Sequence, residues 1–141
     1  MRDKLEKYDI QKLESYWFDY FDKKDGLKKQ LYLRELELLI PYREEDTNGM
    51  IKGSGTSDLT SQKAIAIAED KKYQNLKLIY QSVEDIYKSL DDEAKKIVQS
   101  KYSERYHSWE DIGESLYMSK SKVLRIRNKI LDLTAEFIGW V

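Results

Sequence analysis

The chain has 141 residues, of which 40% are hydrophobic and 36% charged, so it has enough apolar material for a core and too much for full disorder. It has no cysteine, which excludes a disulfide framework and thiolate metal sites, and it has no apolar run typical of a signal peptide or a membrane span. We therefore expect a soluble, cytoplasmic protein. The formal net charge of −1 excludes a general polycation, so any contact with nucleic acid has to come from a local basic patch.

Residues 1–41 are predicted to form an N-terminal helical hairpin. Apolar residues keep a helical spacing of three or four in the first segment, at Ile10, Leu13, Trp17 and Tyr20. Lys23 to Gly26 resembles a helix end followed by a turn. Helical spacing resumes through residues 28–40, and Pro41 is expected to end that helix, because proline disfavours the helical conformation of the residue before it.

An aromatic cluster occupies the end of the first segment. Five of the six residues from 16 to 21 are aromatic, and one stripe of a helix cannot bury all of them. The first interpretation is a large aromatic core. The second is a surface for a protein partner or a second copy, formed by Tyr16, Trp17, Tyr20 and Phe21.

Residues 42–58 are rich in Gly, Ser, Thr, Asn and Asp, and predict a flexible loop. Residues 59–90 then predict a long amphipathic central helix, with a break near residues 70–72 as the alternative. Such a helix packs within its own domain or pairs with a second copy of the chain, and both possibilities stay open.

Residues 91–141 predict a helix-turn-helix unit, so that the whole chain is expected to be all-α. Asp91 is suited to cap one helix, Ser108 a second and Ser119 a third, and Tyr117-Met118 separates the last two. In the final helix the core face is predicted from a repeat of three or four, which gives Val123, Ile126, Ile130 and Leu133.

The final helix also carries the candidate DNA contacts. From Tyr117 to Leu131 there are five cations and no acid, which is the local field that a phosphate backbone attracts. The start of such a helix enters the major groove, so the candidate base-reading residues are Lys120, Ser121 and Arg125. The candidate phosphate contacts are Ser119, Lys122, Arg127 and Lys129.

No catalytic, metal-binding or cofactor-binding set is predicted. His107 is the single histidine, and no nucleophile, paired carboxylates or metal-ligand spacing accompanies it. Gly53-Ser54-Gly55 lacks the Lys-Ser or Lys-Thr pair and the preceding strand of a phosphate-binding loop. We therefore expect neither an enzyme nor a cofactor.

The C-terminal part resembles region 4 of sigma factors, the part that reads the −35 promoter element. The matching stretches are Leu90–Ala94, Trp109–Leu116 and Ser119–Arg127. The resemblance places the base-reading positions on Lys120, Ser121 and Arg125. Sigma factors tend to carry an acid in place of Ser121, so a target other than the consensus −35 element is expected.

The layout of the whole chain resembles the RinA and ArpU group of phage late transcription regulators. The shared features are a short helical N-terminal part, a loop of the type found from Pro41 to Gly49, a long helix and a sigma-like C-terminal reader. The resemblance covers roughly residues 10–139. It implies activation of late operons for packaging and structural proteins by binding a promoter.

The leading hypothesis is therefore a sequence-specific DNA-binding transcription regulator, acting on double-stranded DNA with host RNA polymerase. A second copy of the chain is a further candidate partner, and no membrane is expected. One alternative is a phage DNA-packaging protein of the small terminase type, which assembles into a ring. The other is a helical module that binds RNA polymerase rather than DNA.

Overall fold

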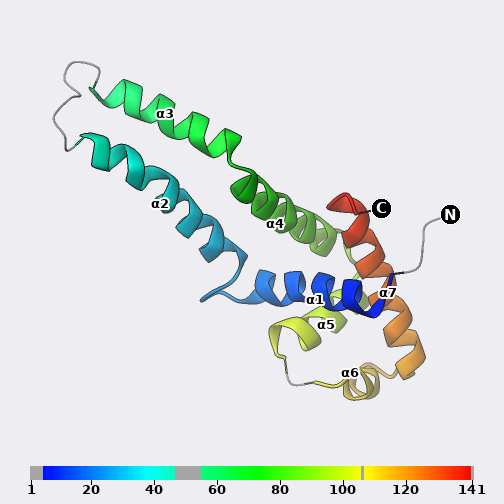
Figure 1. Cartoon of the computed structure of the whole chain (residues 1–141). Helices are drawn as coiled ribbons and strands as arrows, with labels where there is room; N and C mark the ends of the chain where they lie inside the picture. The colour runs from blue at the N-terminus through cyan, green and yellow to red at the C-terminus, as the bar shows by residue number, and fades with distance from the viewer. Residues whose placement is uncertain (1–4, 47–54, 106, 141) are drawn as a thin grey trace.

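The computed structural model describes residues 5–46, 55–105 and 107–140, and for 40–46 and 55–60 it gives the backbone only. Throughout these ranges the regular structure is helical, so the prediction of an all-α fold is confirmed (Figure 1). The helices are α1 (Lys7–Phe21), α2 (Leu27–Asp46), α3 (Gly55–Glu69), α4 (Lys71–Ser89), α5 (Asp92–Val98), the π-helix η1 (Gln99–Ser103), α6 (Trp109–Ser115) and α7 (Lys120–Phe137).

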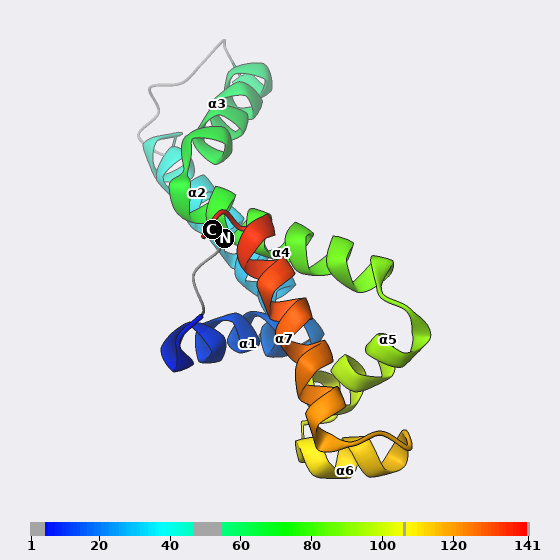
Figure 2. The same cartoon turned by 90° about the vertical axis from the view of Figure 1, so that its right-hand side faces the viewer.

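The molecule has an elongated arm and a body. α2 runs outward alongside α3 and α4, which return toward the body, and these three helices form the arm (Figures 1 and 2). α1, the inner part of α4 and the helices from α5 to α7 form the body. α1 and α2 are joined by a short turn, as expected, but α2 packs mainly along α3 and α4 rather than back along α1.

The turn between α1 and α2 depends on Gly26. A Cβ at this position would lie 2.0 Å from the carbonyl oxygen of Asp22 and 2.1 Å from that of Asp19. The backbone of residue 26 therefore packs directly on the end of α1, and only glycine allows that approach. The sequence located this helix end correctly.

Pro41 does not end α2, which continues to Asp46, so that prediction is wrong. Proline removes one backbone donor, and its fixed φ is compatible with a helix, so neighbouring hydrogen bonds can carry the helix past it. α3 begins at Gly55, which shortens the predicted 42–58 loop at both ends. Residues 47–54, the rest of that loop, lie outside the described residues.

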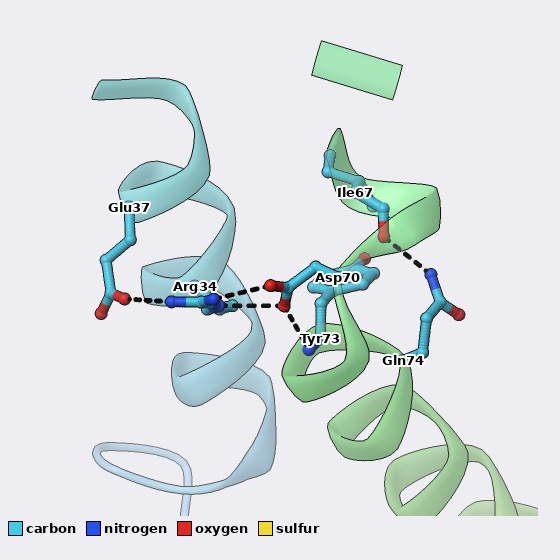
Figure 3. A network of polar contacts seen from close by, with 6 residues as sticks. All are labelled: Arg34, Glu37, Ile67, Asp70, Tyr73 and Gln74. Atoms are coloured by element: carbon cyan, nitrogen blue, oxygen red, sulfur yellow. Dashed lines mark hydrogen bonds and ion pairs between the residues drawn. The ribbon is translucent and has the colours of Figure 1, made fainter. Parts of the chain in front are cut away.

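The predicted central helix is divided into α3 and α4 at Asp70, so the alternative with a break is the correct one. Asp70 caps α4 by accepting a hydrogen bond from the Tyr73 amide at 2.7 Å. It also accepts two hydrogen bonds from Arg34 of α2, at 3.0 Å from Nε and 2.6 Å from Nη2 (Figure 3). This contact lowers the pKa of Asp70 to about 2, chiefly through Arg34 and next through the Tyr73 amide.

The same network of hydrogen bonds joins the three helices of the arm. Arg34 Nη1 donates to Glu37 at 2.7 Å, and the Gln74 side chain donates to the Ile67 carbonyl at 2.9 Å across the break (Figure 3). The guanidinium fork of Arg34 matches the carboxylate of Asp70 in two places, which fixes geometry as well as charge. The kink between α3 and α4 is thus set by a polar contact with α2.

The main core lies where α1 crosses α4 and α7. Leu13, Trp17 and Val83 are each 0% exposed, and Ile86 and Leu131 each 1%. The Trp17 indole N–H donates to the Thr134 hydroxyl of α7 at 3.0 Å. A buried indole needs such a partner, because an unpaired donor in the core is costly.

The aromatic cluster is therefore mainly core, as its first interpretation predicted. Trp17 is inaccessible, so its assignment to a partner surface is wrong. Tyr16, Tyr20 and Phe21 are half-buried and pack against the core. Tyr20 and Phe21 also line an open hollow of about 750 Å³ beside α4 and η1.

The short π-helix η1 brings Tyr102 into this core. Its ring lies 4.9 Å from that of Phe18 and 6.1 Å from that of Trp17, and it is 1% exposed. A π-helix has a wider turn than an α-helix, so it rotates the side chains that follow it. Tyr102 thereby connects α1 with the helices that follow η1.

Candidate nucleic-acid interface

α6 and α7 form a helix-turn-helix arrangement whose two beginnings were located correctly from the sequence. Ser108 accepts a hydrogen bond from the Asp111 amide at 3.0 Å and so caps α6. Ser119 accepts one from the Lys122 amide at 3.1 Å and caps α7. Each serine satisfies a backbone donor that the first turn of a helix leaves free.

The turn between these helices is closed by two backbone hydrogen bonds. The Met118 amide donates to the Gly113 carbonyl at 2.8 Å, and the Tyr117 amide donates to Glu114 at 3.3 Å. This is the pattern of a Schellman cap, in which one residue adopts the left-handed conformation. Here that residue is Tyr117, with φ of 59°, and its side chain is 97% exposed.

A small second core fixes the angle between α6 and α7. Ile97, Ile112 and Val123 form it, and Leu116 and Met118 pack against it. Gly113 is required at this crossing, because a Cβ there would lie 2.7 Å from the Met118 carbonyl oxygen.

The core face of α7 turns further around the helix than predicted. Val123 and Ile130 are buried and Ile126 is half-buried, as expected, but Leu133 is 39% exposed. Leu131 takes its place in the core and is 1% exposed. The reason is that α1 packs on the second half of α7 from another side, where Trp17 meets Thr134.

The opposite face of α7 is exposed and basic in its first part. The exposed side chains there include those of Lys120, Ser121, Lys122, Arg125 and Lys129. All three candidate base-reading residues are thus accessible, as are Ser119, Lys122 and Lys129 among the phosphate candidates. The half-buried Asp132 and the exposed Glu136 follow, so the basic face is confined to the first half of the helix.

Two lysines of this face have acidic neighbours. Lys120 Nζ lies 3.1 Å from Glu110 Oε1, and Lys122 Nζ lies 3.8 Å from Glu93 Oε1. Both pairs are well exposed, and exposed ion pairs are weak and screened by salt. These lysines can therefore exchange their carboxylates for a phosphate. No ion pair to a described residue holds Arg125 or Lys129.

Ser119 can still donate a hydrogen bond although it caps α7. Its oxygen accepts the hydrogen bond from Lys122, and its hydroxyl proton remains available to a phosphate oxygen. Its exposed position at the beginning of α7 is also where a helix favours an anion.

Arg127 differs from the other phosphate candidates and is engaged within the protein. Its side chain is 16% exposed and lies 3.8 Å from Glu14 of α1. The guanidinium lies over the Trp109 ring at 5.3 Å, and its Nε donates to the Asn128 side chain at 2.9 Å. Arg127 therefore links α7 to α1 and α6, and it would have to give up these contacts to bind a DNA phosphate.

Glu14 of α1 supports the candidate interface from inside the protein, and the sequence analysis did not identify it. It accepts a hydrogen bond from the Tyr102 hydroxyl at 2.6 Å and also faces Arg127. Burial, and next the charge of Glu14, raise the pKa of Tyr102 well above its usual range. The contact joins residues 88 positions apart, so no local pattern could have predicted it.

His107 lies between α5 and α6, outside the basic face. Its Nε2 lies 3.2 Å from Glu104 Oε2, an exposed contact with a residue three positions earlier. Nearby, the Lys101 ammonium donates to the His107 carbonyl at 3.2 Å and lies over the Trp109 ring at 4.9 Å. These contacts order the entry to α6.

The fold and this face define an all-helical protein with a helix-turn-helix arrangement at its C-terminal end. Residues 1–136 match the family described as "Protein of unknown function (DUF722)", and the chain belongs to this family. No curated protein and no solved structure matches the chain significantly. Among the described residues, no helix combines the length and the apolar character needed to cross a membrane.

Proposed function

We propose that this protein is a sequence-specific DNA-binding transcription regulator that reads double-stranded DNA with α7. The observation that carries the proposal is the exposed basic face of α7, presented by a capped helix-turn-helix arrangement whose other face is buried. A recognition helix needs both properties, because it has to be held rigidly by its core side while its outer side enters the major groove.

The positions of the side chains suit a division of roles. Lys120, Ser121 and Arg125 lie on the exposed side of the first turns of α7, where side chains reach base edges. Arg and Lys side chains recognise guanine, and a Ser hydroxyl can contact more than one kind of base. Ser119, Lys122 and Lys129 flank them and are suited to phosphates, which position the protein.

The biological setting that we propose comes from the resemblance of the chain to sigma region 4 and to phage late regulators. Under this proposal the protein activates late operons for packaging and structural proteins in a bacterial host, together with host RNA polymerase. The near-neutral net charge fits such a role, since specific binding then depends on one local patch.

The direct test is a fluorescence anisotropy titration of the full chain with DNA from upstream of a late operon, against a shuffled duplex of the same composition. We expect tighter binding to the operon DNA than to the shuffled duplex. We also expect the logarithm of the binding constant to fall linearly with the logarithm of the salt concentration. Equal affinity for both duplexes would contradict sequence-specific binding. A salt-independent affinity would contradict the phosphate contacts.

The two other functions make different demands on the molecule. A packaging protein of the small terminase type requires a ring of many copies, which light scattering detects. A polymerase-binding module that uses the aromatic cluster is disfavoured, because Trp17 is fully buried. Binding to purified polymerase without DNA, lost on substitution of the half-buried Tyr20, would support that module instead.

A further inference from the structure

The arm helix α2 has apolar side chains on two faces. Leu27 belongs to the main core and is 2% exposed. Tyr32, Leu33 and Leu36 are 56%, 44% and 38% exposed. A helix packed on one side needs a single apolar stripe, whereas a helix that is apolar all round is normally covered all round.

Nothing in the described chain covers the outer side of α2. The helix packs against α1 at its beginning and against α3 and α4 along its length. Figure 1 shows α2 along one side of the arm, with α3 and α4 on its other side. Its outer apolar side chains are thus available to a partner.

We propose that two copies of this chain pair through the arm face, which we define as Lys29, Tyr32, Leu33, Leu36 and Glu37 of α2. The occupant of the face is a second, antiparallel α2. This inference does not depend on the proposed function, because it concerns the protein alone.

The charges of the arm face favour a second copy. Lys29, Leu33 and Glu37 are spaced by four residues, and rows with this spacing form the ridges of the commonest helix packings. A two-fold axis at Leu33 brings Lys29 of each copy to the partner's Glu37. The same helix thus supplies both members of each ion pair, as a self-complementary interface requires.

Both charged side chains can make this contact. Lys29 is exposed and has no ion pair within the described residues. The Glu37 side chain is 55% exposed and accepts one hydrogen bond from Arg34 at 2.7 Å. A carboxylate has several acceptor sites, so a second donor can be added.

The surface beside Leu33 is also hollowed. An open hollow of about 160 Å³ lies between α2 and α4, and its lining includes Leu33, Glu37, Lys72 and Leu76. Apolar Leu33 and Leu76 form part of its wall. A side chain from a crossing helix can fill such a hollow, which is how ridges of one helix enter grooves of another.

The first test is the molar mass of the full chain without DNA, by sedimentation equilibrium over a range of concentrations. We expect a mass twice that of one chain for the natural protein and that of one chain for Leu33→Glu, which places two like charges at the axis. Circular dichroism should be unchanged, since Leu33 is exposed. Tyr8→Glu, at a 73% exposed position of α1, is the matched control and should remain dimeric.

The second test is a charge exchange. Lys29→Glu and Glu37→Lys should each weaken the dimer about tenfold, as expected for loss of two exposed ion pairs, and the double variant should restore it. Restoration would also show that the lost contact of Glu37 with Arg34 is not the cause. The proposal would be overturned if the natural protein were monomeric at every concentration or formed a larger ring. It would also be overturned if the Leu33→Glu variant remained dimeric, or if the double variant dimerised as weakly as the single ones.

Discussion

Arg125 and Arg127 lie two positions apart on α7 and have opposite environments. Arg125 is exposed on the basic face, whereas Arg127 is 16% exposed between Glu14 and Trp109. Two positions along a helix correspond to a rotation of about 200°, so such residues point to different sides. At the scale of single residues, the environment of a cation therefore decides whether it can meet DNA.

This contrast gives a first prediction about the basic face. Arg125→Ala should relax base preference at one position and cost about 1–3 kcal/mol of binding free energy. Lys129→Ala should weaken binding evenly across sequences and reduce the salt slope by about 1. Anisotropy titrations with a set of singly substituted operators measure both effects, and Lys77→Ala, on the exposed side of α4, is the control. The division of roles fails if the two variants behave alike.

Gly113 gives a second prediction at this scale. Glycine to alanine within a helix usually stabilises, by roughly 0.5–1 kcal/mol. Here the added Cβ would lie 2.7 Å from the backbone oxygen of Met118, which cannot swing away as a side chain can. Gly113→Ala should therefore lower the free energy of unfolding by about 1–3 kcal/mol. Urea unfolding measures this free energy. Glu114→Ala, at an exposed neighbouring position, is the control. A Gly113→Ala variant as stable as the natural protein, or more stable, would contradict the steric conflict with Met118.

At the scale of elements, α3 and α4 are separated by one acid that contacts another helix. Asp70 begins α4 and at the same time binds Arg34 of α2, so the break in the central segment and the closure of the arm have the same cause. The sequence showed that residues 70–72 could interrupt a helix. It did not show the partner, which is 36 positions away.

The contact predicts how the stability of the arm depends on pH. The pKa of Asp70 is lowered from 3.8 to about 2 in the folded protein, so its charged form is favoured by folding. The contribution of Asp70 to the free energy of unfolding is fully present above the pKa that Asp70 has in the unfolded chain. It is lost as the pH falls through the pKa that Asp70 has in the folded protein. Asp70→Asn should thus be less stable than the natural protein at neutral pH, and the difference should shrink between about pH 4 and pH 2.

Urea unfolding at several pH values, followed by circular dichroism, measures this difference. The comparison between two proteins cancels the titration of the other carboxylates, which both contain. Glu69→Gln, an exposed change at the adjacent position, should show no such narrowing. A difference that stays constant down to pH 2 would show that the charge of Asp70 does not contribute.

At the scale of the whole molecule, the arm face lies on α2 and the basic face on the first half of α7, and these two helices stand apart in Figure 1. A single recognition helix buries a small area of DNA, and a dimer doubles it. If both proposals hold, pairing through α2 leaves both α7 helices free to contact DNA. The target is then expected to contain two half-sites related by a two-fold axis.

This arrangement predicts that pairing controls affinity for a complete operator. Leu33→Glu should weaken binding to a duplex with both half-sites by about 10²-fold or more, because linked binding events reinforce each other. Binding to a duplex with one half-site should be unchanged, since Leu33 lies on α2 and is not part of the basic face. Anisotropy with the two duplexes distinguishes these outcomes, and an equal loss on both would indicate a folding defect instead.

The sequence by itself determined the local features of this protein. Helical periodicity, the capping residues Asp91, Ser108 and Ser119, and the all-α fold were all correct, because helices and their caps depend on residues a few positions apart. The exposure of Lys120, Ser121 and Arg125 also followed from helix geometry. Whether these residues contact DNA remains a prediction.

Only the tertiary structure decided the features that depend on distant residues. The burial of Trp17, the exposure of Leu133, the engagement of Arg127 by Glu14 and the partner of Asp70 all arise where α1 or α2 meets a helix far along the chain. The local predictions that failed are the end of α2 at Pro41 and the start of the next helix after residue 58. Periodicity shows which residues share a face of one helix, and the packing of another helix against that face decides which of them are covered.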